Sequence, residues 1–573
     1  MPSYAVRYEG TLPKQMTVTS IIKSISASER FWIIIMIIFV LAATSLPYLF
    51  GLLSTPPDSV YLANYHRASG DHYVYMSMIE EAKDGALTFH NLFTGEEHAP
   101  LLVRPFWFTV GALARVFDLD SRMAIQIFRL VLIIPTVFVI YFTIAVFVKK
   151  KPARLIAFLF SVLASGFGYF YYRWINPDIL PDIYTINFYD TPSDIWLTEG
   201  HPLLLFSASP HFQASLIFLL LSLVFFFLGF RYGKTSYLVI SGLLNLGLAF
   251  FHPYETVFIF AIITVFTLLI FSWQFWKRKF LNGWQSIKKL IIPIAITAPG
   301  IIYQLLIFRL EPTLKSWSEQ SQTISPEIQF YLIGYGILIP LAILGSFFAI
   351  KKLNQQKVFL LIWCWLTIPL LYIPIAFNRR FIEGLFVPLG ILAAVGVYNL
   401  YSKITRGKLS KIIFVVIACL ILGASLIPTN AYNLWSFVEV QRQYKVTPFY
   451  LPQTELDALL WLRDNTASGE SILSSHISGF TIPAFTGRPV YLGHDLQTAN
   501  FAAKKPLMEW FFATDIEDEA KIEWLSENRI SYIYYGPNEQ ISGSFAPASK
   551  EYLQTVFAND QVQIYKFIPP SRN

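Results

Sequence analysis

FWIIIMIIFVLAATSLPYLFGLL, residues 31–53, is an apolar run of about the 20 residues that a helix needs to cross hydrocarbon. A second run, FQASLIFLLLSLVFFFLGF (212–230), has the same character. The 573-residue chain is 54% hydrophobic and 14% charged, which is more apolar than a soluble core requires. A polar lead of about 30 residues and the lack of an A-x-A-like site favour a retained span over a cleaved signal peptide. The sequence therefore predicts a polytopic α-helical membrane protein.

The formal net charge of +7 does not indicate nucleic-acid binding, because the basic residues are unevenly distributed. From residue 430 onward acidic residues exceed basic ones, 16 to 11. The excess lies in short loops between apolar runs, which is the positive-inside pattern of membrane proteins. The clusters are Lys149, Lys150, Lys151 and Arg154; Lys277, Arg278, Lys279, Lys288 and Lys289; and Lys403, Arg406, Lys408 and Lys411.

Placing every basic cluster in the cytoplasm predicts about eleven transmembrane helices. Residues 1–30 then form a cytoplasmic segment, 31–429 a transmembrane domain with an outward first loop at 54–121, and 430–573 an extracytoplasmic domain. The hydrophobic stretch 101–117 contains Arg104 and Arg115, so we interpret it as an interfacial helix rather than a transmembrane span. The expected spans are 31–53, 122–148, 153–172, 210–230, 235–251, 254–276, 289–308, 328–350, 357–377, 382–400 and 411–428.

Residues 430–573 have the composition of a small soluble α/β domain. TELDALLWLRDN, from Thr454, has capping-box spacing with Asp457 and continues as an amphipathic helix. Strand-like pieces SILSS, PVYLG, ISYIYYG and QVQIYKF alternate with helical pieces around 503–513 and 515–528. The domain has no G-x-G-x-x-G opening a helix, which argues against dinucleotide binding.

The stretch GDHYVYMSMIEEAKDG, residues 70–85, follows the first span and faces outward in this topology. On a helix starting at Asp71, the side chains of Glu80, Glu81 and Asp84 point away from the apolar face, so we expect them to be solvated. Asp71 differs because free backbone N–H groups at a helix start stabilise a carboxylate. Taken alone, it is equally an N-cap or a catalyst.

The order of these features resembles the GT-C superfamily of membrane glycosyltransferases. The likeness rests on one span, an outward loop with Asp71, Tyr75, Ala82 and Gly85 in a D…Y…A..G pattern, the Pro-led interfacial helix HAPLLVRPFWFTVGALARVF, many further spans and an outward domain. The resemblance implies transfer of a sugar from a polyprenyl-phosphate carrier to an extracytoplasmic glycan, lipid or protein. The oligosaccharyltransferase signature WWDYG is absent, which argues against transfer of a large glycan to Asn.

The resemblance also implies site residues. The first-loop aspartate of the family corresponds to Asp71, followed here by His72 where many members have a second acid. An R…PD pattern matches YYRWINPD, which makes Arg173 and Asp178 candidates for substrate binding. An Arg-led span with a proline matches NRRFIEGLFVPLG at Arg379 and Arg380.

Elementary chemistry supports two of these assignments independently. A carboxylate with a reference pKa of about 3.9 is ionised at neutral pH, so Asp71 can act as a general base toward an acceptor hydroxyl. Planar guanidinium groups suit a lipid phosphate, and Arg379 and Arg380 lie at the headgroup level of a span. Interfacial snorkelling of the two arginines is the alternative.

FFHPYET, residues 250–256, places His252 and Glu255 at the outer tip of a short hairpin, three residues apart. We expect them to contact substrate, although a lone histidine at a helix junction is more often a structural hydrogen bonder. No cofactor is certain, and a divalent ion, Mg²⁺ or Mn²⁺, is an option. Its weak candidate ligands are His72, Asp178, Asp182 and His211.

Further polar residues lie in outward segments. Asp190, Asp194 and Glu199 belong to a loop long enough to form a lid, with solvation the simpler expectation for each. His476, Arg488, His494 and Asp495 either face the acceptor or shape loops of the carboxyl-terminal domain.

The leading hypothesis is thus a multi-pass glycosyltransferase of the plasma or inner membrane, with membrane lipids, a lipid-linked sugar and an acceptor as partners. A transporter or lipid flippase is the rival, but it predicts charges at mid-span and matching halves. A non-catalytic protein of envelope assembly is the third alternative.

Overall fold

The computed structural model describes residues 16–175, 188–404, 407–514 and 517–570, and it divides into two compact units. Unit 1 comprises Met1–Pro47, Arg129–Gln304 and Thr323–Glu439, and unit 2 comprises Tyr48–Phe128, Leu305–Gln322 and Val440–Asn573. The sequence-based division differs: its boundary at residues 429 and 430 falls within helix α20 (Pro428–Gln443), and the first loop belongs to the same unit as the carboxyl-terminal residues.

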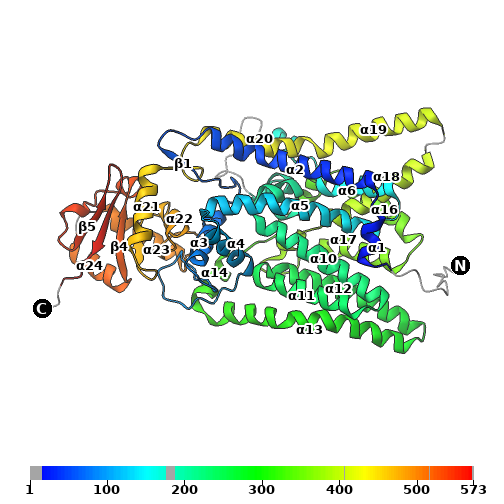
Figure 1. The fold of residues 1–573 in the computed structure, drawn as a ribbon, viewed down its shortest axis with the longest axis horizontal. Helices are drawn as coiled ribbons and strands as arrows, with labels where there is room; N and C mark the ends of the chain where they lie inside the picture. Colours follow the sequence, from blue (N-terminus) through cyan, green and yellow to red (C-terminus); the bar gives the residue numbers. More distant parts are fainter. Residues whose placement is uncertain (1–15, 176–187, 405–406, 515–516, 571–573) are drawn as a thin grey trace. The chain divides into compact units, whose positions relative to one another are not determined.

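Unit 1 is helical throughout the residues that the structure describes (Figure 1). Helices α2, α5 and α13 begin in one unit and end in the other. The elements are α1 (Val18–Ser24), α2 (Ala27–Leu53), α5 (Ser121–Phe147), α6 (Lys151–Val162), α7 (Gly168–Ile175), η1 (Phe188–Asp190), α8 (Ser193–Trp196), η2 (Thr198–Gly200), α9 (Pro202–Ser207), α10 (Pro210–Tyr232), α11 (Thr235–Phe251), α12 (Pro253–Trp276), α13 (Phe280–Leu310), α15 (Ile328–Tyr335), α16 (Leu338–Ile350), α17 (Gln355–Leu370), η3 (Asn378–Ile382), α18 (Phe386–Ile404), α19 (Lys408–Leu426) and α20.

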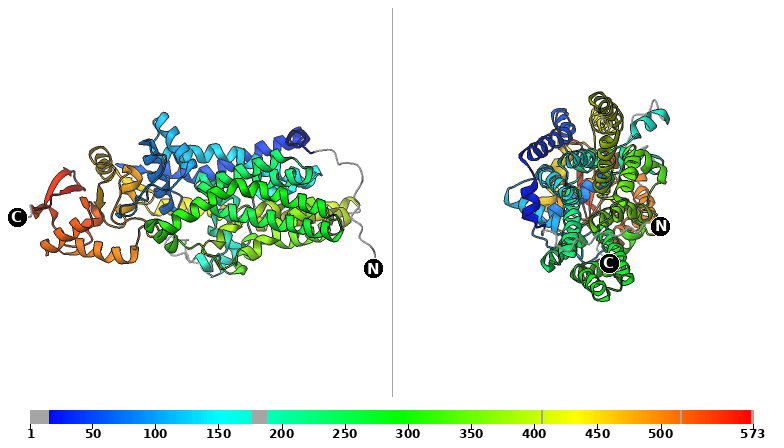
Figure 2. Two further views of the ribbon diagram at one scale, coloured as in Figure 1. Left: turned by 90° about the horizontal axis from the view of Figure 1, so that it is seen from below. Right: turned by 90° about the vertical axis from the view of Figure 1, so that its right-hand side faces the viewer.

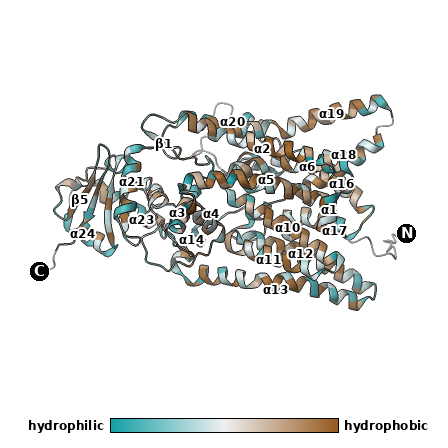
Figure 3. Cartoon of the chain, in the orientation of Figure 1, coloured by the Kyte–Doolittle hydropathy of each residue, from teal (hydrophilic) through white to brown (hydrophobic). Residues whose placement is uncertain are grey.

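Seven helices within the described ranges are long and apolar enough to cross a membrane, or eight if one bent pair counts as a span. They are Ala27–Leu53, Ser121–Phe147, Pro210–Tyr232, Pro253–Trp276, Phe280–Leu310, Asn378–Ile404 and Lys408–Gln443. Hydrophobic residues dominate these helices (Figure 3). The prediction of a polytopic helical membrane protein is therefore confirmed, while several of the eleven expected spans are shorter than a full crossing.

Two of the expected spans are broken, and their breaks pack against each other. The predicted span 153–172 ends as α6 at Val162 and resumes as α7, and 328–350 is split into α15 and α16 at an angle of 85°. Gly336, with φ +49°, makes the second turn, and a Cβ there would lie 2.8 Å from Cα of Gly166. The N–H of Phe167 donates to the carbonyl of Ile333 at 2.8 Å, so each break satisfies the other's backbone.

Helix α18 is the most buried candidate span of unit 1, with 89% of its apolar window enclosed. It approaches α16 closely because both helices carry glycine at the contact: a Cβ on Gly345 would lie 1.8 Å from the carbonyl oxygen of Leu392, and one on Gly396 would lie 2.4 Å from that of Leu341. Figure 2 shows the helices of this unit side by side and end-on. This packing fixes the segment that precedes α18, residues 378–385.

Unit 2 contains short helices and a mixed four-stranded sheet in the order β3-β4-β6-β5, in which β3 pairs parallel with β4 and the other neighbours pair antiparallel. Its elements are β1 (Ser59–Tyr61), α3 (Ser69–Lys83), α4 (Pro105–Val116), α14 (Pro312–Gln320), β2 (Tyr450–Pro452), α21 (Gln453–Asn465), β3 (Ser471–Leu473), α22 (Ser478–Thr486), α23 (Phe501–Ala513), α24 (Asp518–Glu527), β4 (Ile530–Tyr535), α25 (Pro537–Gln540), η4 (Pro547–Ser549), β5 (Leu553–Ala558) and β6 (Gln563–Phe567).

The first loop is joined to the carboxyl-terminal region by backbone pairing within unit 2. Strand β1 pairs antiparallel with β2, and the N–H of Val490 donates to the carbonyl of Leu92 at 3.0 Å. The hydroxyl of Thr498 donates to the carbonyl of Phe93 at 2.6 Å. These long-range pairings explain why the loop and the α/β region form one unit, a relation that local sequence pattern does not encode.

Three local expectations for unit 2 need correction. PVYLG forms two isolated bridges rather than a strand, a parallel one between Val490 and Ile472 and an antiparallel one between Leu492 and Thr94. Strand β5 was not predicted because its pattern is largely exposed. The capping box at Thr454 is not formed, because the helix starts two residues earlier, at Gln453, with Pro452 as its N-cap. The Thr454 hydroxyl instead donates to Oε1 of Gln561 at 2.5 Å.

Candidate functional site

Asp71 lies in the first turn of α3, as expected, and its neighbour is a histidine from the carboxyl-terminal region. Oδ1 of Asp71 is 3.6 Å from Nε2 of His494, whose side chain is 8% exposed against 46% for the aspartate. The N–H of Leu496 donates to Nδ1 of His494 at 3.1 Å. Because Nδ1 accepts this hydrogen bond, the neutral imidazole carries its proton on Nε2, facing the carboxylate.

Small and aromatic residues shape the surroundings of this pair. A Cβ on Gly70 would lie 3.2 Å from Nε2 of His494 and 3.3 Å from the ring of Phe480, so glycine leaves room for the imidazole. The rings of Phe480 and Phe93 lie 5.4 and 6.1 Å from that of His494. The arrangement leaves the aspartate accessible while the histidine is fixed.

Glu80 and Glu81, farther along α3, are buried rather than solvated as predicted. The N–H of His90 donates to Oε1 of Glu81 at 3.2 Å, and Nδ1 of His90 is 2.9 Å from the same oxygen. Burial raises the pKa of both carboxyl groups. The helix itself was predicted correctly. The face of α3 that was predicted to be solvated is instead covered by α22. Only Asp84 of the three acids is exposed, with 68% of its side chain accessible.

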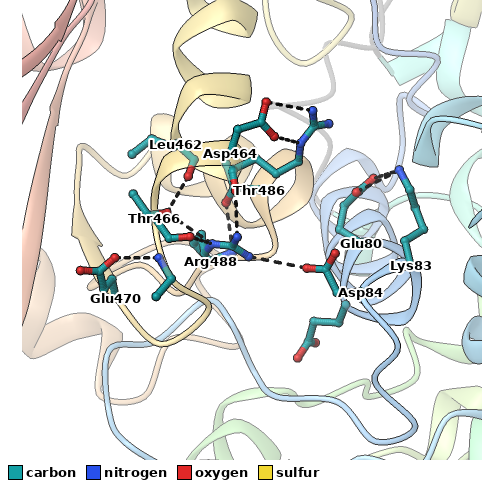
Figure 4. A network of polar contacts seen from close by, with 12 residues as sticks. Glu80, Lys83, Asp84, Leu462, Asp464, Thr466, Glu470, Thr486 and Arg488 are labelled. Atoms are coloured by element: carbon teal, nitrogen blue, oxygen red, sulfur yellow. Dashed lines mark hydrogen bonds and ion pairs between the residues drawn. The ribbon is translucent and has the colours of Figure 1, made fainter.

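Arg488 connects α3 with the segments that follow α21 (Figure 4). Its Nε donates to the carbonyl of Thr466 at 3.0 Å, and its Nη2 donates to the carbonyl of Arg463 at 2.8 Å. Its Nη1 lies 3.7 Å from Oδ2 of Asp84. The Arg488 side chain is buried and donates to backbone carbonyls, so we assign it a structural role.

In unit 1, His252, Glu255 and Glu383 form a buried cluster, the H-E-E triad. His252 precedes Pro253 at the junction of α11 and α12, Glu255 lies in the first turn of α12, and Glu383 follows η3. Nδ1 of His252 is 2.5 Å from Oε2 of Glu255 and 3.4 Å from Oε2 of Glu383. The pairing of His252 with Glu255 matches their predicted proximity.

Arg379 and Arg380 lie in η3, immediately before Glu383. Nη1 of Arg380 forms an ion pair with Oε1 of Glu199, and the guanidinium of Arg379 stacks over Trp196 with its carbon 5.0 Å from the ring centroid. Burial alone would raise the pKa of Glu199, but the two guanidinium groups outweigh it and hold that pKa below its usual value. Both arginines are thus oriented by residues of the 188–209 segment.

The segment 188–209 is largely buried, which corrects the expectation that its acids are solvated. Oδ2 of Asp194 accepts hydrogen bonds from the N–H of Gly166 at 2.9 Å and the hydroxyl of Ser165 at 3.1 Å. Burial raises the pKa of Asp194 to about 6. Glu199 is also buried, and only Asp190 of the three is exposed. Asp194 anchors this segment to the break between α6 and α7.

Among the remaining predicted residues, those that the structure describes belong neither to the pair of Asp71 and His494 nor to the H-E-E triad. Arg173 is exposed near the end of α7, and Asp178 and Asp182 lie outside the described residues. His72 is buried on α3 beside Tyr75. His211 is buried with Nδ1 2.9 Å from the Ser209 hydroxyl, and its ring lies 5.5 Å from that of His252. Among the described residues, the metal-competent group is the H-E-E triad rather than the candidate ligands named from sequence.

Sequence reasoning missed Glu383, and it named Glu199 only as a residue of a lid-like loop without its pairing to Arg380. Glu383 has a detectable signal, because it is an acid just inside an expected apolar span, where a charge is costly unless it has a partner. Glu199 has no comparable local signal, since its partner Arg380 is 181 residues away.

Comparison with known proteins adds information at the level of fold. No family model and no curated protein matches this sequence. Among solved structures, the oligosaccharyltransferase AglB from Archaeoglobus fulgidus, in complex with an inhibitory peptide and a dolichol-phosphate, superposes with a TM-score of 0.54 over 89% of this chain and 70% of its own, at 14% identity. The chain has the GT-C fold.

Two further GT-C structures agree with this assignment. The same archaeal enzyme in its apo form gives a TM-score of 0.54 at 12% identity, over 92% of this chain and 73% of that one. The arabinofuranosyltransferase AftD from Mycobacteria gives 0.52 at 14% identity, over 94% of this chain but 42% of its own. At these identities the likeness defines the fold, and the GT-C fold is that of a multi-pass membrane protein.

Proposed function

We propose that this protein is a membrane glycosyltransferase that moves a sugar from a polyprenyl-phosphate donor to an extracytoplasmic glycan, lipid or protein. It acts in the plasma or inner membrane, with the amino terminus in the cytoplasm and residues 430–573 outside. The observation that carries the proposal is the GT-C fold, shared with two glycosyltransferases of different substrates. The complex of AglB with dolichol-phosphate supports a lipid-linked donor for this chain as well.

Asp71 is the proposed general base. It lies in the first turn of α3, where the partial positive charge of a helix amino terminus stabilises a carboxylate. It takes the proton of the acceptor hydroxyl as that oxygen attacks the anomeric carbon. The bond from this carbon to the phosphate oxygen breaks, so a single displacement inverts the configuration. Nε2 of His494 lies 3.6 Å from Oδ1 of Asp71, and a side-chain rotation that brings its N–H within hydrogen-bond distance would orient the carboxylate for this step.

Arg379 and Arg380 are the proposed ligands of the departing lipid phosphate. The phosphate leaves with the electron pair of the broken bond, and guanidinium groups stabilise such charge best when they are held in place beforehand. Glu199 and Trp196 supply that orientation through the ion pair with Arg380 and the stacking contact with Arg379. Arg173 and Asp178 remain proposed substrate contacts on the strength of the sequence resemblance.

A divalent ion, Mg²⁺ or Mn²⁺, belongs to the proposal as an option. Such an ion neutralises phosphate charge when bound near a leaving group. A structure of the archaeal enzyme in complex with Zn and sulfate has a TM-score of 0.50 to this chain. Of the two ions, the H-E-E triad suits Mn²⁺, because it offers one imidazole nitrogen beside two carboxylates.

The fold favours catalysis over the two alternatives. A flippase or transporter would share the apolar helices and even the broken pair α15–α16, but neither glycosyltransferase neighbour is described as one. A non-catalytic envelope protein would not need two arginines held by a buried acid and an aromatic ring at the start of a span.

The proposal is tested with purified protein in two steps. Mass spectrometry of lipids that co-purify with it is expected to detect polyprenyl phosphates. Mass-tagged prenyl-phosphate sugars incubated with the protein and envelope extract are then expected to lose their sugar to a heavier acceptor. Retention of every tagged sugar on its prenyl phosphate, across hexose, pentose and amino-sugar donors, would contradict the proposal.

A further inference from the structure

The H-E-E triad places three potential metal ligands together in unit 1. One nitrogen of His252 and one oxygen each of Glu255 and Glu383 all lie within 4.8 Å of one another. The residues are 5%, 0% and 0% exposed. They come from two separate segments, the α11–α12 junction and the turn after η3, so the fold itself assembles them.

Hydrogen bonding from the described residues does not account for the triad. Neither carboxylate oxygen of Glu255 or of Glu383 receives a hydrogen bond of acceptable geometry, although all four atoms are buried. Their close polar neighbours are Nδ1 of His252 and the hydroxyl of Ser215, which interacts with Glu383 and lies 3.1 Å from the same nitrogen. A ring nitrogen offers one proton or one lone pair, so it cannot serve three oxygens at once.

Two buried carboxylates this close together stay ionised only with positive charge between them; otherwise one of them takes up a proton. Isolated ionised groups are very costly in a medium of low dielectric constant, and buried charges in proteins are paired or bind metals. A protonated imidazole of His252 would neutralise the charge of one carboxylate and leave the charge of the other without a counter-charge within the triad. A single divalent cation balances both, and it replaces the crowded contacts at Nδ1 with bonds to separate ligands.

We propose that His252, Glu255 and Glu383 bind one divalent transition-metal ion, Mn²⁺ or Zn²⁺. One imidazole with two carboxylates is a donor set that such ions accept, whereas Mg²⁺ prefers oxygen ligands and several retained waters. Ligands about 2.1 Å from one tetrahedral ion stand roughly 3.4 Å apart. Nδ1 of His252 is already 3.4 Å from Oε2 of Glu383. Its distance to Oε2 of Glu255 is 2.5 Å, and rotation of the Glu255 side chain increases it to the value that a shared ion requires.

The bound ion would join the α11–α12 hairpin to the segment that carries Arg379 and Arg380. Glu383 follows Arg380 by three positions, so an ion at the triad fixes the turn from which both guanidinium groups project. This inference does not rest on sugar transfer, because metal binding by the triad is measurable whatever reaction the protein performs.

The test measures metal content and stability of the full-length protein in detergent. Protein stripped with EDTA is titrated with Mn²⁺ and with Zn²⁺, and bound metal is quantified by mass spectrometry after gel filtration. We compare wild type with Glu383→Gln and His252→Ala. The control is Glu81→Gln, which alters a buried glutamate beside His90 that is not part of a three-ligand group.

We expect about one equivalent of metal in wild type and in Glu81→Gln, and at least about a 10-fold loss of affinity in the two triad variants. Metal should raise the melting temperature of wild type and not that of Glu383→Gln. In metal-free protein, Glu383→Gln should melt above wild type, because it removes one of two like charges. A higher melting temperature of metal-free Glu383→Gln would also show that this variant folds. Absence of stoichiometric Mn²⁺ or Zn²⁺ in wild type, or equal binding by Glu383→Gln, would overturn the proposal and leave a triad neutralised by protons alone.

Discussion

Asp71 and His494 face each other across unit 2, with Oδ1 of the aspartate 3.6 Å from Nε2 of the histidine although 423 positions separate them in sequence. The N–H of Leu496 occupies Nδ1 and so fixes the tautomer that points a proton at the carboxylate. The relation resembles base-and-orienter pairs, in which a second group fixes the geometry of the first.

Replacing His494 is therefore expected to lower sugar transfer without removing it. His494→Ala should reduce kcat about 10-fold or more with little change in donor KM, because the carboxylate loses its orienting proton but keeps its charge. His494→Gln, whose amide can donate from a similar position, should recover part of the loss. Steady-state kinetics with a tagged donor measures both effects. Equal rates in wild type and His494→Ala would show that the contact is incidental.

Arg380 is expected to govern donor binding. Arg380→Ala removes a guanidinium from the proposed phosphate site and leaves Glu199 buried without its partner, so donor KM should rise about 10-fold or more and kcat should fall. Arg380→Lys should restore the charge but not the planar geometry, giving an intermediate KM.

The matched control for Arg380 is Arg529→Ala, which removes an arginine from an ion pair with Glu97 that is exposed on both sides. Its kinetics should equal those of wild type. If Arg380→Ala also retains the wild-type donor KM, the phosphate role of Arg380 is wrong.

Arg488 is expected to contribute to stability. Arg488→Met leaves the carbonyls of Thr466 and Arg463 without their donors, and we expect it to reduce the free energy of unfolding by about 2 to 4 kcal/mol. Arg463→Met should cost much less, since that side chain is 39% exposed and its partner is the adjacent Asp464. Thermal melts of the two variants provide the measurement, and equal melting temperatures would contradict the assigned role of Arg488.

Glu455 makes the stability of unit 2 depend on pH. Burial, aided by the nearby charge of Glu539, raises the pKa of Glu455 to about 7 from an ordinary value of 4.5. The folded state therefore binds the proton more tightly than the unfolded state, so stability falls as pH rises from about 4.5 to about 7 and levels off above. The change amounts to about 3 kcal/mol.

Glu455→Gln should abolish this part of the pH dependence, because an amide does not titrate. Melting temperatures of wild type and Glu455→Gln are compared at pH 5.5 and 8, and the difference between them should grow toward pH 8. A wild-type profile parallel to that of the variant would exclude the effect.

Much of the helical architecture could be predicted from sequence, because each span is a local property of about 20 apolar residues. Ala27–Leu53 and Pro210–Tyr232 match their predicted ranges closely. The broken spans could not be located in this way, since the turns at Gly166 and Gly336 pack against each other across the fold and are joined by the hydrogen bond from the N–H of Phe167 to the carbonyl of Ile333.

In the candidate sites as well, contacts between residues close in sequence could be predicted, and contacts between distant residues could not. The proximity of His252 and Glu255 follows from their spacing of three residues. Glu383 and Glu199 required the tertiary structure, as did the burial of Glu80 and Glu81 under α22. The roles of Asp71, Arg379 and Arg380 stay predictions, because geometry alone does not show which groups touch a substrate.

The central claim, that Asp71 is the base of a sugar transfer, is tested most directly by single-turnover transfer from a tagged prenyl-phosphate sugar. Asp71→Asn keeps the size of the side chain and removes its basicity, and Asp84→Asn changes an exposed acid on the same first-loop segment as a control. We predict that Asp71→Asn loses about 10²-fold or more of the rate while its donor binding and melting temperature stay near those of wild type and Asp84→Asn. Transfer by Asp71→Asn at the wild-type rate would contradict the account.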